Sequence, residues 1–242
     1  MLRTKNIGEY NKLVFLFTRP RGRVKAIAYG ARKIKNRFGS SLEPFTHGYA
    51  HLLEKKGRNY ISLDQMDIIL SSFTLYEDYI IAAHLYYYAE LLDLALPEEQ
   101  AEENIFRLTL EMLKGFNLKL APNLVAAYFE VWLLKLLGLL PEYKSCYYCG
   151  ATLKNQKDIY LAKDGFLFCS ECYVKGIGEG SKISSELINV LSIIFKNKID
   201  SREVRSMQIS RLPLTEWTHS LFSNMVERDI KSYTNLKEIR KP

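Results

Sequence analysis

The sequence lacks several features that mark common classes of protein. The apolar run at residues 133–140 is too short to cross a bilayer and is interrupted by Lys135 and Gly138. No glycine-rich loop continues into Gly-Lys-Ser/Thr, so a Walker-type nucleotide site is not indicated. The four histidines are scattered, with no constellation of Ser, Cys or carboxylates from which a hydrolytic triad could be built. We therefore expect a cytoplasmic protein that does not contact membranes and is not an enzyme.

Cysteine is scarce, and every cysteine belongs to one of two CxxC pairs that are separated by nineteen residues. The four cysteines are Cys146, Cys149, Cys169 and Cys172. Each pair places two sulfurs on one tight turn, and two pairs at this spacing are typical of a four-thiolate zinc site. Because four thiolates complete a tetrahedron, no position is left for an activated water. We therefore predict one structural Zn²⁺.

The residues between the two pairs predict a short hairpin, with strands at 159–161 and 166–168, so the whole insertion is interpreted as a zinc ribbon. An iron site, a disulfide pair and free thiols remain alternatives to zinc. A redox role is less consistent with the sequence, because neither CxxC pair lies beside a βαβ pattern. No signal peptide supports an extracellular disulfide.

Positive charge is concentrated near the N-terminus. Residues 1–60 contain 14 Lys or Arg and three acidic residues, whereas the remaining 182 residues contain 20 basic and 24 acidic residues. This asymmetry indicates a polyanionic partner for the first module. The cations expected to contact phosphates are Arg19, Arg21, Arg23, Lys25, Arg32, Lys33, Lys35 and Arg37. A solvated charge run that only keeps the protein soluble is the alternative interpretation.

Aromatic residues that could stack on bases lie near these cations, although several of them are also candidates for the core. They are Tyr29, Phe38, Phe45 and Tyr49. The run Tyr86-Tyr87-Tyr88 has helical spacing, so ordinary core packing is the more economical interpretation for it.

The first seventy residues show the alternation that is typical of strands. Strands are predicted at 11–18, 23–29, 45–53 and 60–70, with a mobile cation-rich loop at 32–37 and a turn at 55–59. Counting a first strand before residue 11, five short strands in about seventy residues fit a small closed barrel of the OB type.

From Leu75 onward the hydrophobic period becomes helical. Helices are predicted before Pro97, at 104–116, at 122–138 with Gly138 as the C-terminal cap, from Ser184 or Ser185 through Ile194, and at 214–233, with a glycine linker at 176–180. The fold class that follows is α+β, an N-terminal OB-fold β-barrel followed by an all-helical domain with an inserted four-cysteine zinc ribbon. The expected boundaries are 1–73 for the barrel, 74–143 and 178–242 for the helical domain, and 144–177 for the ribbon.

The N-terminal residues 2–18 combine with later short motifs into one recognisable order. These motifs are Gly22, Gly30-Ala31-Arg32, Leu42-Glu43-Pro44-Phe45, Tyr88-Ala89-Glu90-Leu91-Leu92, Phe129-Glu130, Leu136-Leu137-Gly138, Pro141-Glu142 and Lys231-Ser232. Together they resemble the RecO family of bacterial recombination mediators over nearly the whole chain. Family members usually carry several more residues before the position of Leu2, so the resemblance implies either a short first strand or a sequence that starts within that strand.

The resemblance implies an OB fold, a helical domain and a zinc-ribbon-like insertion. It further implies binding of single- and double-stranded DNA, annealing of complementary strands, contact with the single-strand binding protein SSB, and action with RecR and RecF to load RecA onto SSB-covered gaps. RecO proteins are not ATPases, which agrees with the missing Walker motif.

The tail of SSB is short, acidic and apolar at its end, so its receptor is expected to be a hydrophobic helical groove bordered by cations. The predicted helix at 122–138 offers Phe129, Trp132, Lys135 and Leu136 for this groove. Packing of the same residues in the core is an equally good interpretation. For the whole protein, two alternatives come from other classes: a zinc-ribbon scaffold that binds only proteins, and an enzyme with an unrecognised pocket.

Overall fold

The computed structural model describes residues 1–54, 60–154, 156, 158–176, 180–209, 212–226 and 230–239. The turn expected at 55–59 and the middle of the expected glycine linker lie outside these residues. The chain divides into two compact units, Met1–Arg107 with Ile230–Pro242, and Leu108–Asp229. The division falls within helix α2 (Glu103–Asn117). No helix in the described ranges has the length and apolar character needed to cross a membrane.

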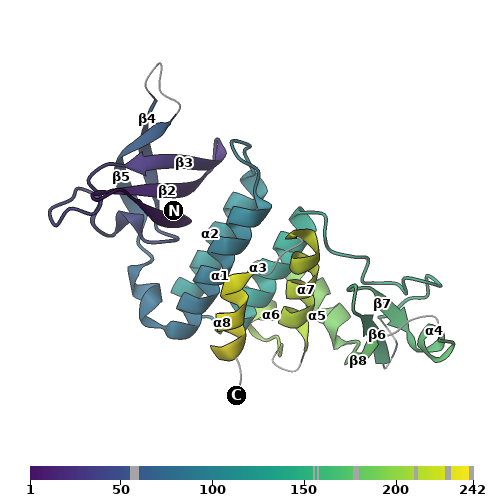
Figure 1. Cartoon of the computed structure of the whole chain (residues 1–242). Coiled ribbons are helices and arrows are strands. Elements are labelled where there is room, and N and C mark those ends of the chain that lie inside the picture. Colours follow the sequence, from purple (N-terminus) through teal and green to yellow (C-terminus); the bar gives the residue numbers. More distant parts are fainter. Residues whose placement is uncertain are drawn as a thin grey trace. The chain divides into compact units, whose positions relative to one another are not determined.

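The first unit contains a five-stranded sheet, drawn in purple and blue in Figure 1. The strands are β1 (Arg3–Ile7), β2 (Asn11–Thr18), β3 (Gly22–Ala28), β4 (His47–Glu54) and β5 (Ile61–Leu70). Their order is β1-β2-β3-β5-β4, with β3 and β5 parallel and every other pair antiparallel. This topology is that of an OB fold and agrees with the predicted class.

The two edges of the sheet approach each other at the beginning of the chain. The Phe45 amide donates to the Met1 carbonyl at 2.7 Å, and the Leu2 amide donates to Phe15 on β2 at 2.8 Å. The lead-in to β4 is thereby tied to the lead-in to β1, which gives the sheet the curvature of a partly open barrel. Its buried interior is formed by Met1, Val14, Leu16, Ala26, Ala28, Ala31, Phe38, Leu42 and Leu63.

The helices of the first unit are the 3-10 helix η2 (Phe73–Glu77), α1 (Tyr79–Ala95) and α8 (Lys231–Ile239), and α8 lies along α1 in Figure 1. A short 3-10 helix, η1 (Gly39–Leu42), precedes β4. Helix α1 starts at Asp78, whose carboxylate accepts from the Ile80 and Ile81 amides. It ends at Ala95, before Pro97, as predicted.

The single helix predicted at 214–233 is wrong, because α7 (Leu214–Val226) and α8 are separate helices. The Glu90 carboxylate of α1 accepts hydrogen bonds from the backbone amides of Lys231 and Ser232 at 3.2 and 2.8 Å. A helix start needs such acceptors, and here they come from a residue 141 positions earlier in the chain. Local sequence around 230 therefore gave no sign of the new helix.

The second unit is built on α3 (Pro122–Leu136), α5 (Glu186–Lys196), α6 (Arg202–Arg205) and α7. Helix α3 ends at the predicted glycine, since Gly138 has a φ of +72°. The Tyr128 hydroxyl and the Trp132 indole donate to backbone carbonyls of Asn197 and Ile194, both at 3.2 Å. Thr218 of α7 donates to the fully buried Glu130 of α3, so the core of this unit includes a satisfied carboxylate.

A three-stranded sheet of order β7-β6-β8 and the short helix α4 (Ser170–Val174) carry the second cysteine pair, and the first pair lies in the segment before β6. The predicted hairpin is confirmed as β6 (Asp158–Ala162) and β7 (Leu167–Cys169). The third strand, β8 (Gly180–Ser184), was not predicted. The hairpin turn contacts α7, where the Trp217 indole donates to the Gly165 carbonyl at 3.0 Å.

Substituting Gly22 by alanine should destabilise the first unit more than substituting Gly8. Both glycines have positive φ, +62° and +56°, so both alanines carry a similar backbone penalty of about 1–2 kcal/mol. Only at Gly22 would the new Cβ meet backbone, at 1.7 Å from the Gln100 carbonyl oxygen, whereas at Gly8 it meets nothing within 4 Å. In urea unfolding, Gly22→Ala should cost about 1–3 kcal/mol more than Gly8→Ala. Equal losses of stability in the two variants would show that the segment around Gln100 does not pack on the turn between β2 and β3.

Candidate functional site

The four cysteines come together at one end of the small sheet. All four sulfurs lie within 4.8 Å of one another, and Cys149 Sγ is 3.7 Å from Cys169 Sγ. A tetrahedral ion with metal–sulfur bonds of about 2.3 Å holds its sulfurs about 3.8 Å apart, so the cluster has the dimensions of a four-thiolate metal site. None of the four cysteines forms a disulfide.

Backbone hydrogen bonds shape each half of this cluster. The Cys146 amide donates to Ala151 at 2.8 Å and the Gly150 amide donates to Cys146 at 3.0 Å, while Gly150 has a φ of +73°. In the second half, the Cys172 amide donates to the Cys169 sulfur at 3.4 Å. Both arrangements are tight turns that point two sulfurs at one centre, as the CxxC spacing predicted.

The thiols differ in how readily they ionise. Burial raises the pKa of Cys172 to about 12. Burial also opposes ionisation of Cys146, but surrounding backbone amides, that of Cys149 first among them, lower its pKa to about 6. Four thiolates this close repel one another unless a cation sits between them. The donor set therefore fits one metal ion that prefers sulfur, with all protein ligands supplied by this chain.

The four predicted cations around β3 are already paired with carboxylates of the first unit. Arg19 makes a bidentate contact with Glu103 at 2.7 Å, and Lys25 contacts Glu98 at 2.5 Å. Arg21 pairs with Glu54 and, at 3.4 Å, with Glu99. The ammonium of Lys25 holds the pKa of Glu98 below its usual range.

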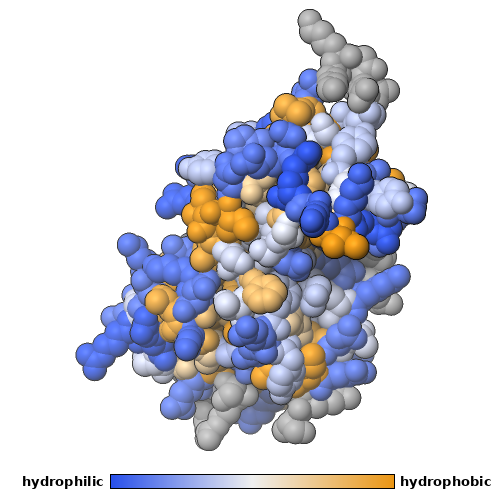
Figure 2. Space-filling view, turned by 90° about the vertical axis from the view of Figure 1, so that its left-hand side faces the viewer, coloured by the Kyte–Doolittle hydropathy of each residue, from blue (hydrophilic) through white to orange (hydrophobic). Residues whose placement is uncertain are grey.

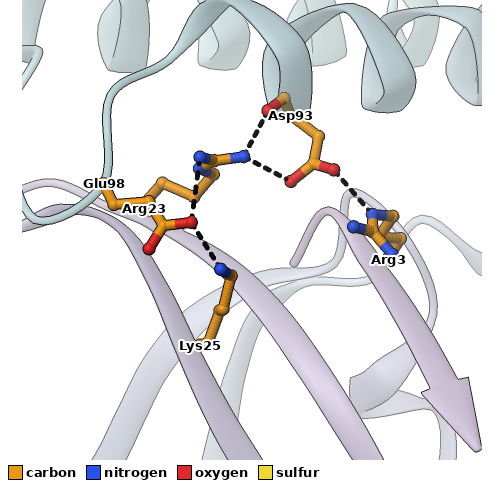
Figure 3. Close-up of polar contacts among 5 residues, drawn as sticks. All are labelled: Arg3, Arg23, Lys25, Asp93 and Glu98. Carbon is orange, nitrogen blue, oxygen red and sulfur yellow. Dashed lines mark hydrogen bonds and ion pairs between the residues drawn. The ribbon is translucent and has the colours of Figure 1, made fainter.

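The most enclosed of these cations is Arg23 (Figure 3). Its guanidinium contacts Asp93 Oδ1 at 3.0 Å and Glu98 at 3.2 Å, and it donates to the Asp93 carbonyl. Asp93 also accepts from Arg3 of β1 at 2.8 Å. The side chains of Arg23 and Asp93 are only 16% and 12% exposed, so a DNA phosphate could reach Arg23 only by displacing a mostly buried carboxylate.

The structure thus separates the eight predicted cations into two sets. The strand set, Arg19 to Lys25, faces the carboxylates Asp93, Glu98, Glu99 and Glu103, which the prediction overlooked. The sequence did contain a signal, an acidic run directly after Pro97. The expected continuous phosphate-binding face is therefore interrupted by ion pairs around β3.

The loop set, Arg32 to Arg37, lies on a segment fixed at both ends. At its start, the Gly30 amide donates to Asn11 Oδ1 at 2.9 Å and the Arg32 amide donates to the Tyr10 carbonyl at 3.0 Å. At its end, Arg37 contacts Asp64 at 3.1 Å and Phe38 is buried. The loop contains neither helix nor strand, as predicted. It was also expected to be mobile, whereas these contacts tie both of its ends to the sheet.

The tip of this loop offers the accessible charge. Lys33 and Lys35 are both exposed, and neither makes an ion pair with any residue in the described ranges. The Lys33 ammonium lies 5.7 Å from the centre of the exposed Tyr10 ring. The guanidinium of Arg32 donates to the Gly8 carbonyl at 3.0 Å and stays exposed.

The candidate stacking residues also fall into two groups. Phe38 and Phe45 are buried in the barrel, whereas Tyr49 is exposed and Tyr29 contacts Tyr60 edge-on at 6.5 Å. In the tyrosine run, the second and third rings are fully buried and the first, Tyr86, is exposed. Figure 2 shows one face of the molecule on which hydrophobic side chains form separate small patches among hydrophilic ones.

On helix α3, the proposed groove residues differ in access. Phe129 is fully buried and Leu136 is half-buried, whereas Lys135 is exposed. The Lys135 ammonium lies 4.8 Å from the Trp132 ring centre and 4.2 Å from that of Phe195 on α5. The structure therefore brings Lys135 and Trp132 together at an aromatic surface and removes Phe129 from it.

A groove of about 880 Å³ lies between the small sheet and α7 within the second unit. Its described lining is mainly apolar, including Leu161, Tyr173, Ile183 and Trp217, with Lys163 and Glu216 as the charged members. No histidine or cysteine is among these lining residues. The serines of this lining, Ser181 and Ser220, therefore have no histidine beside them among its residues.

Comparisons with known proteins agree with these features. The family model described as Recombination protein O N terminal matches residues 1–72, and the one described as Recombination protein O C terminal matches residues 76–234.

Individual relatives cover most of the chain. A DNA repair protein RecO from Koribacter versatilis is 33% identical over 174 residues, which are 71% of this chain and 70% of that protein. The Bacillus subtilis protein of the same name is 32% identical over 177 residues, 72% of this chain and 67% of its own length. One from Exiguobacterium is 27% identical over 237 residues, 98% of this chain and 90% of its own. The chain belongs to the RecO family, whose members are non-enzymatic mediators of DNA repair and recombination.

Proposed function

We propose that this protein binds single- and double-stranded DNA through phosphate contacts, anneals complementary strands, and acts with RecR and RecF to load RecA onto SSB-coated DNA. Membership of the RecO family supports the overall role. The observation that carries the DNA-binding part is the fixed loop at 30–38, which presents Lys33 and Lys35 without ion-pair partners in the described ranges. In the cytoplasm, the nucleic acid of the cell would be the abundant polyanion.

Contacts of this kind are electrostatic and carry little sequence preference. Each neutralised phosphate releases condensed counterion, so the logarithm of affinity falls with the logarithm of salt concentration, by about 0.7 per contact on single strands and about 0.9 on duplex. Three contacts from Arg32, Lys33 and Lys35 would give a slope of about −2 on single strands. The strand cations Arg19, Arg21, Arg23 and Lys25 add to this slope only where DNA displaces their carboxylates.

Reversing the charge of the loop tip tests this proposal. In Lys33→Glu/Lys35→Glu, two phosphate contacts are lost, so the single-strand salt slope should flatten by about 1.4 and affinity at low salt should fall at least about tenfold. The measurement is fluorescence anisotropy of labelled single and double strands over a series of salt concentrations, followed by an annealing assay. Both lysines are exposed, and circular dichroism should not change.

A matched control is Lys196→Glu/Lys237→Glu, which changes net charge equally at two exposed lysines far from the loop in sequence. Affinity and slope should stay near wild type in this control. Equal losses in both variants would show a general charge effect, and unchanged binding in the loop variant would place DNA on another surface. Absence of DNA affinity in the wild type at physiological salt would favour the protein-only scaffold.

We also propose that the metal of the four-cysteine cluster is zinc and that it is structural. The supporting observations are the all-sulfur donor set and the sulfur spacing, which match a closed Zn²⁺ site. When bound, zinc would hold the two turns together through Cys146, Cys149, Cys169 and Cys172. We further propose that the chain has the three modules expected from its sequence, namely the N-terminal barrel, the helical domain, and the zinc ribbon as an insertion within the helical domain.

Cys149→Ser should lose most of the metal, which we expect at about one zinc per chain in protein purified without chelator. Elemental analysis measures the metal, and hydrogen exchange should show faster exchange around 144–176 while the N-terminal sheet stays protected. Tyr148→Ser is the control, because Tyr148 lies between the same ligands and is 65% exposed. Wild-type protein without stoichiometric metal would end the zinc proposal.

The SSB tail is proposed to bind at the exposed part of α3. The support is chemical complementarity, because Lys135 beside the Trp132 and Phe195 rings offers a cation and an apolar surface to an acidic tail with an apolar end. Leu136 borders this surface, and the buried Phe129 can only support it from beneath.

Lys135→Glu should weaken binding of an SSB tail peptide about fivefold or more, since an attraction is replaced by a repulsion. Anisotropy of a labelled peptide measures this, with Lys237→Glu as an equally charged control. Tail binding that is the same in Lys135→Glu as in wild type would place the receptor elsewhere on the molecule.

A further inference from the structure

The tip of the loop at 30–38 carries an isoleucine that contacts almost nothing. Ile34 has a relative exposure of 102%, higher than any other large hydrophobic residue in the described ranges. Single exposed hydrophobic residues are common on protein surfaces and need no special explanation. Ile34 differs from the ordinary case in its immediate neighbours, because it lies between Lys33 and Lys35.

The loop holds this tip in a defined place. On the N-terminal side, the Lys33 amide donates to the Gly30 carbonyl at 3.0 Å, and Ala31 is buried in the barrel core. On the C-terminal side, the Asn36 side chain donates to the Lys33 carbonyl at 3.0 Å and its oxygen accepts from the Phe38 amide at 3.0 Å. Ile34 is therefore presented on a braced turn rather than on a free segment.

The side chains at the tip suit the two chemical parts of a nucleotide, since lysines attract its phosphate and an isoleucine can contact its base. Lys33 and Lys35 make no ion pairs within the described ranges and can each reach a phosphate. Residues two apart are at most about 7 Å apart along the chain, about twice the 3.4 Å rise per base along one stacked strand. The phosphates on either side of an opened base step are two linkages apart and so lie farther from each other than this, but the long flexible side chains of Lys33 and Lys35 can diverge to reach them. The apolar side chain between the two lysines would then face the opened step.

We propose that Ile34 inserts between adjacent bases of single-stranded DNA while Lys33 and Lys35 hold the phosphates on either side. This inference rests on the proposed DNA-binding function. It specifies the ligand of the loop tip as two neighbouring bases of single-stranded DNA that are no longer stacked on each other. An apolar wedge between bases separates them at a cost in stacking, and that cost is smaller in a single strand than in a paired duplex. Ile34 is thus a positioning residue for annealing, because bases that are held apart expose their pairing edges to a second strand.

The experiment uses the full-length protein and single-stranded oligonucleotides that contain 2-aminopurine, whose fluorescence rises when it is unstacked. Wild-type protein should raise this fluorescence on binding. Ile34→Ala should abolish the rise, weaken single-strand affinity about tenfold through the lost apolar contact, and slow annealing, while the salt slope stays unchanged because both lysines remain. Ile34→Leu should restore the fluorescence rise and most of the affinity.

Ile68→Ala is the matched control, since Ile68 is an exposed isoleucine on β5 of the same sheet with no lysine beside it in sequence. It should behave like wild type. Ile34→Ala with wild-type fluorescence and affinity would overturn the insertion, as would wild-type binding without any fluorescence rise.

The loop variant Lys33→Glu/Lys35→Glu distinguishes this failure from failure of the proposed function. If the double variant loses affinity but Ile34→Ala does not, the loop binds phosphates and the insertion is wrong. If neither variant changes binding, the proposed DNA-binding role of the loop is wrong as well.

Discussion

The first unit depends on one shared ion-pair network, in which Asp93 joins Arg3 of β1 to Arg23 of β3 and Glu98 joins Arg23 to Lys25 (Figure 3). Exposed pairs contribute little individually, about 0–1 kcal/mol each, but Arg23 and Asp93 are mostly withdrawn from water and cannot exchange partners freely. The network fixes the acidic segment after α1 against β3. It therefore engages Arg23 and Lys25 with carboxylates, whereas Lys33 and Lys35 on the loop at 30–38 stay exposed without an ion pair in the described ranges.

This arrangement changes how the charge asymmetry of the chain should be interpreted. The excess of basic residues in the first sixty positions suggested one continuous phosphate-binding face, yet half of the named cations pair with acidic residues beyond position 90 or with Glu54. Net charge counted along a sequence overestimates accessible charge when the compensating carboxylates come from a distant segment. The proposed affinity for DNA would then depend more on the few cations that the loop presents without an ion pair in the described ranges than on the total charge.

In the second unit, the four-cysteine cluster lies beside a sheet that is too small to have a core of its own. This sheet has three short strands and could bury little apolar surface alone. It is anchored to α7 through Trp217 and Gly165, and the proposed metal would hold it together through the four cysteines. The aromatic surface at Lys135 belongs to the same unit and is formed where α3 meets α5. The small sheet and the aromatic surface thus each contact residues of the packed helices.

The sequence by itself determined the family, the fold class, the strands β2 to β5, the helices α1, α2, α3 and α5, and the clustering of the four cysteines, because periodicity and CxxC spacing are local properties. Only the tertiary structure decided that Glu90 caps the start of α8, that β8 completes the small sheet, that Phe129 is buried, and that the strand cations are paired. Each of these outcomes is a contact between residues far apart in the chain. The hydrophobic period and the local charge of the sequence do not encode such contacts. The pairing of a given carboxylate with a given cation is fixed only when the helices and strands pack together.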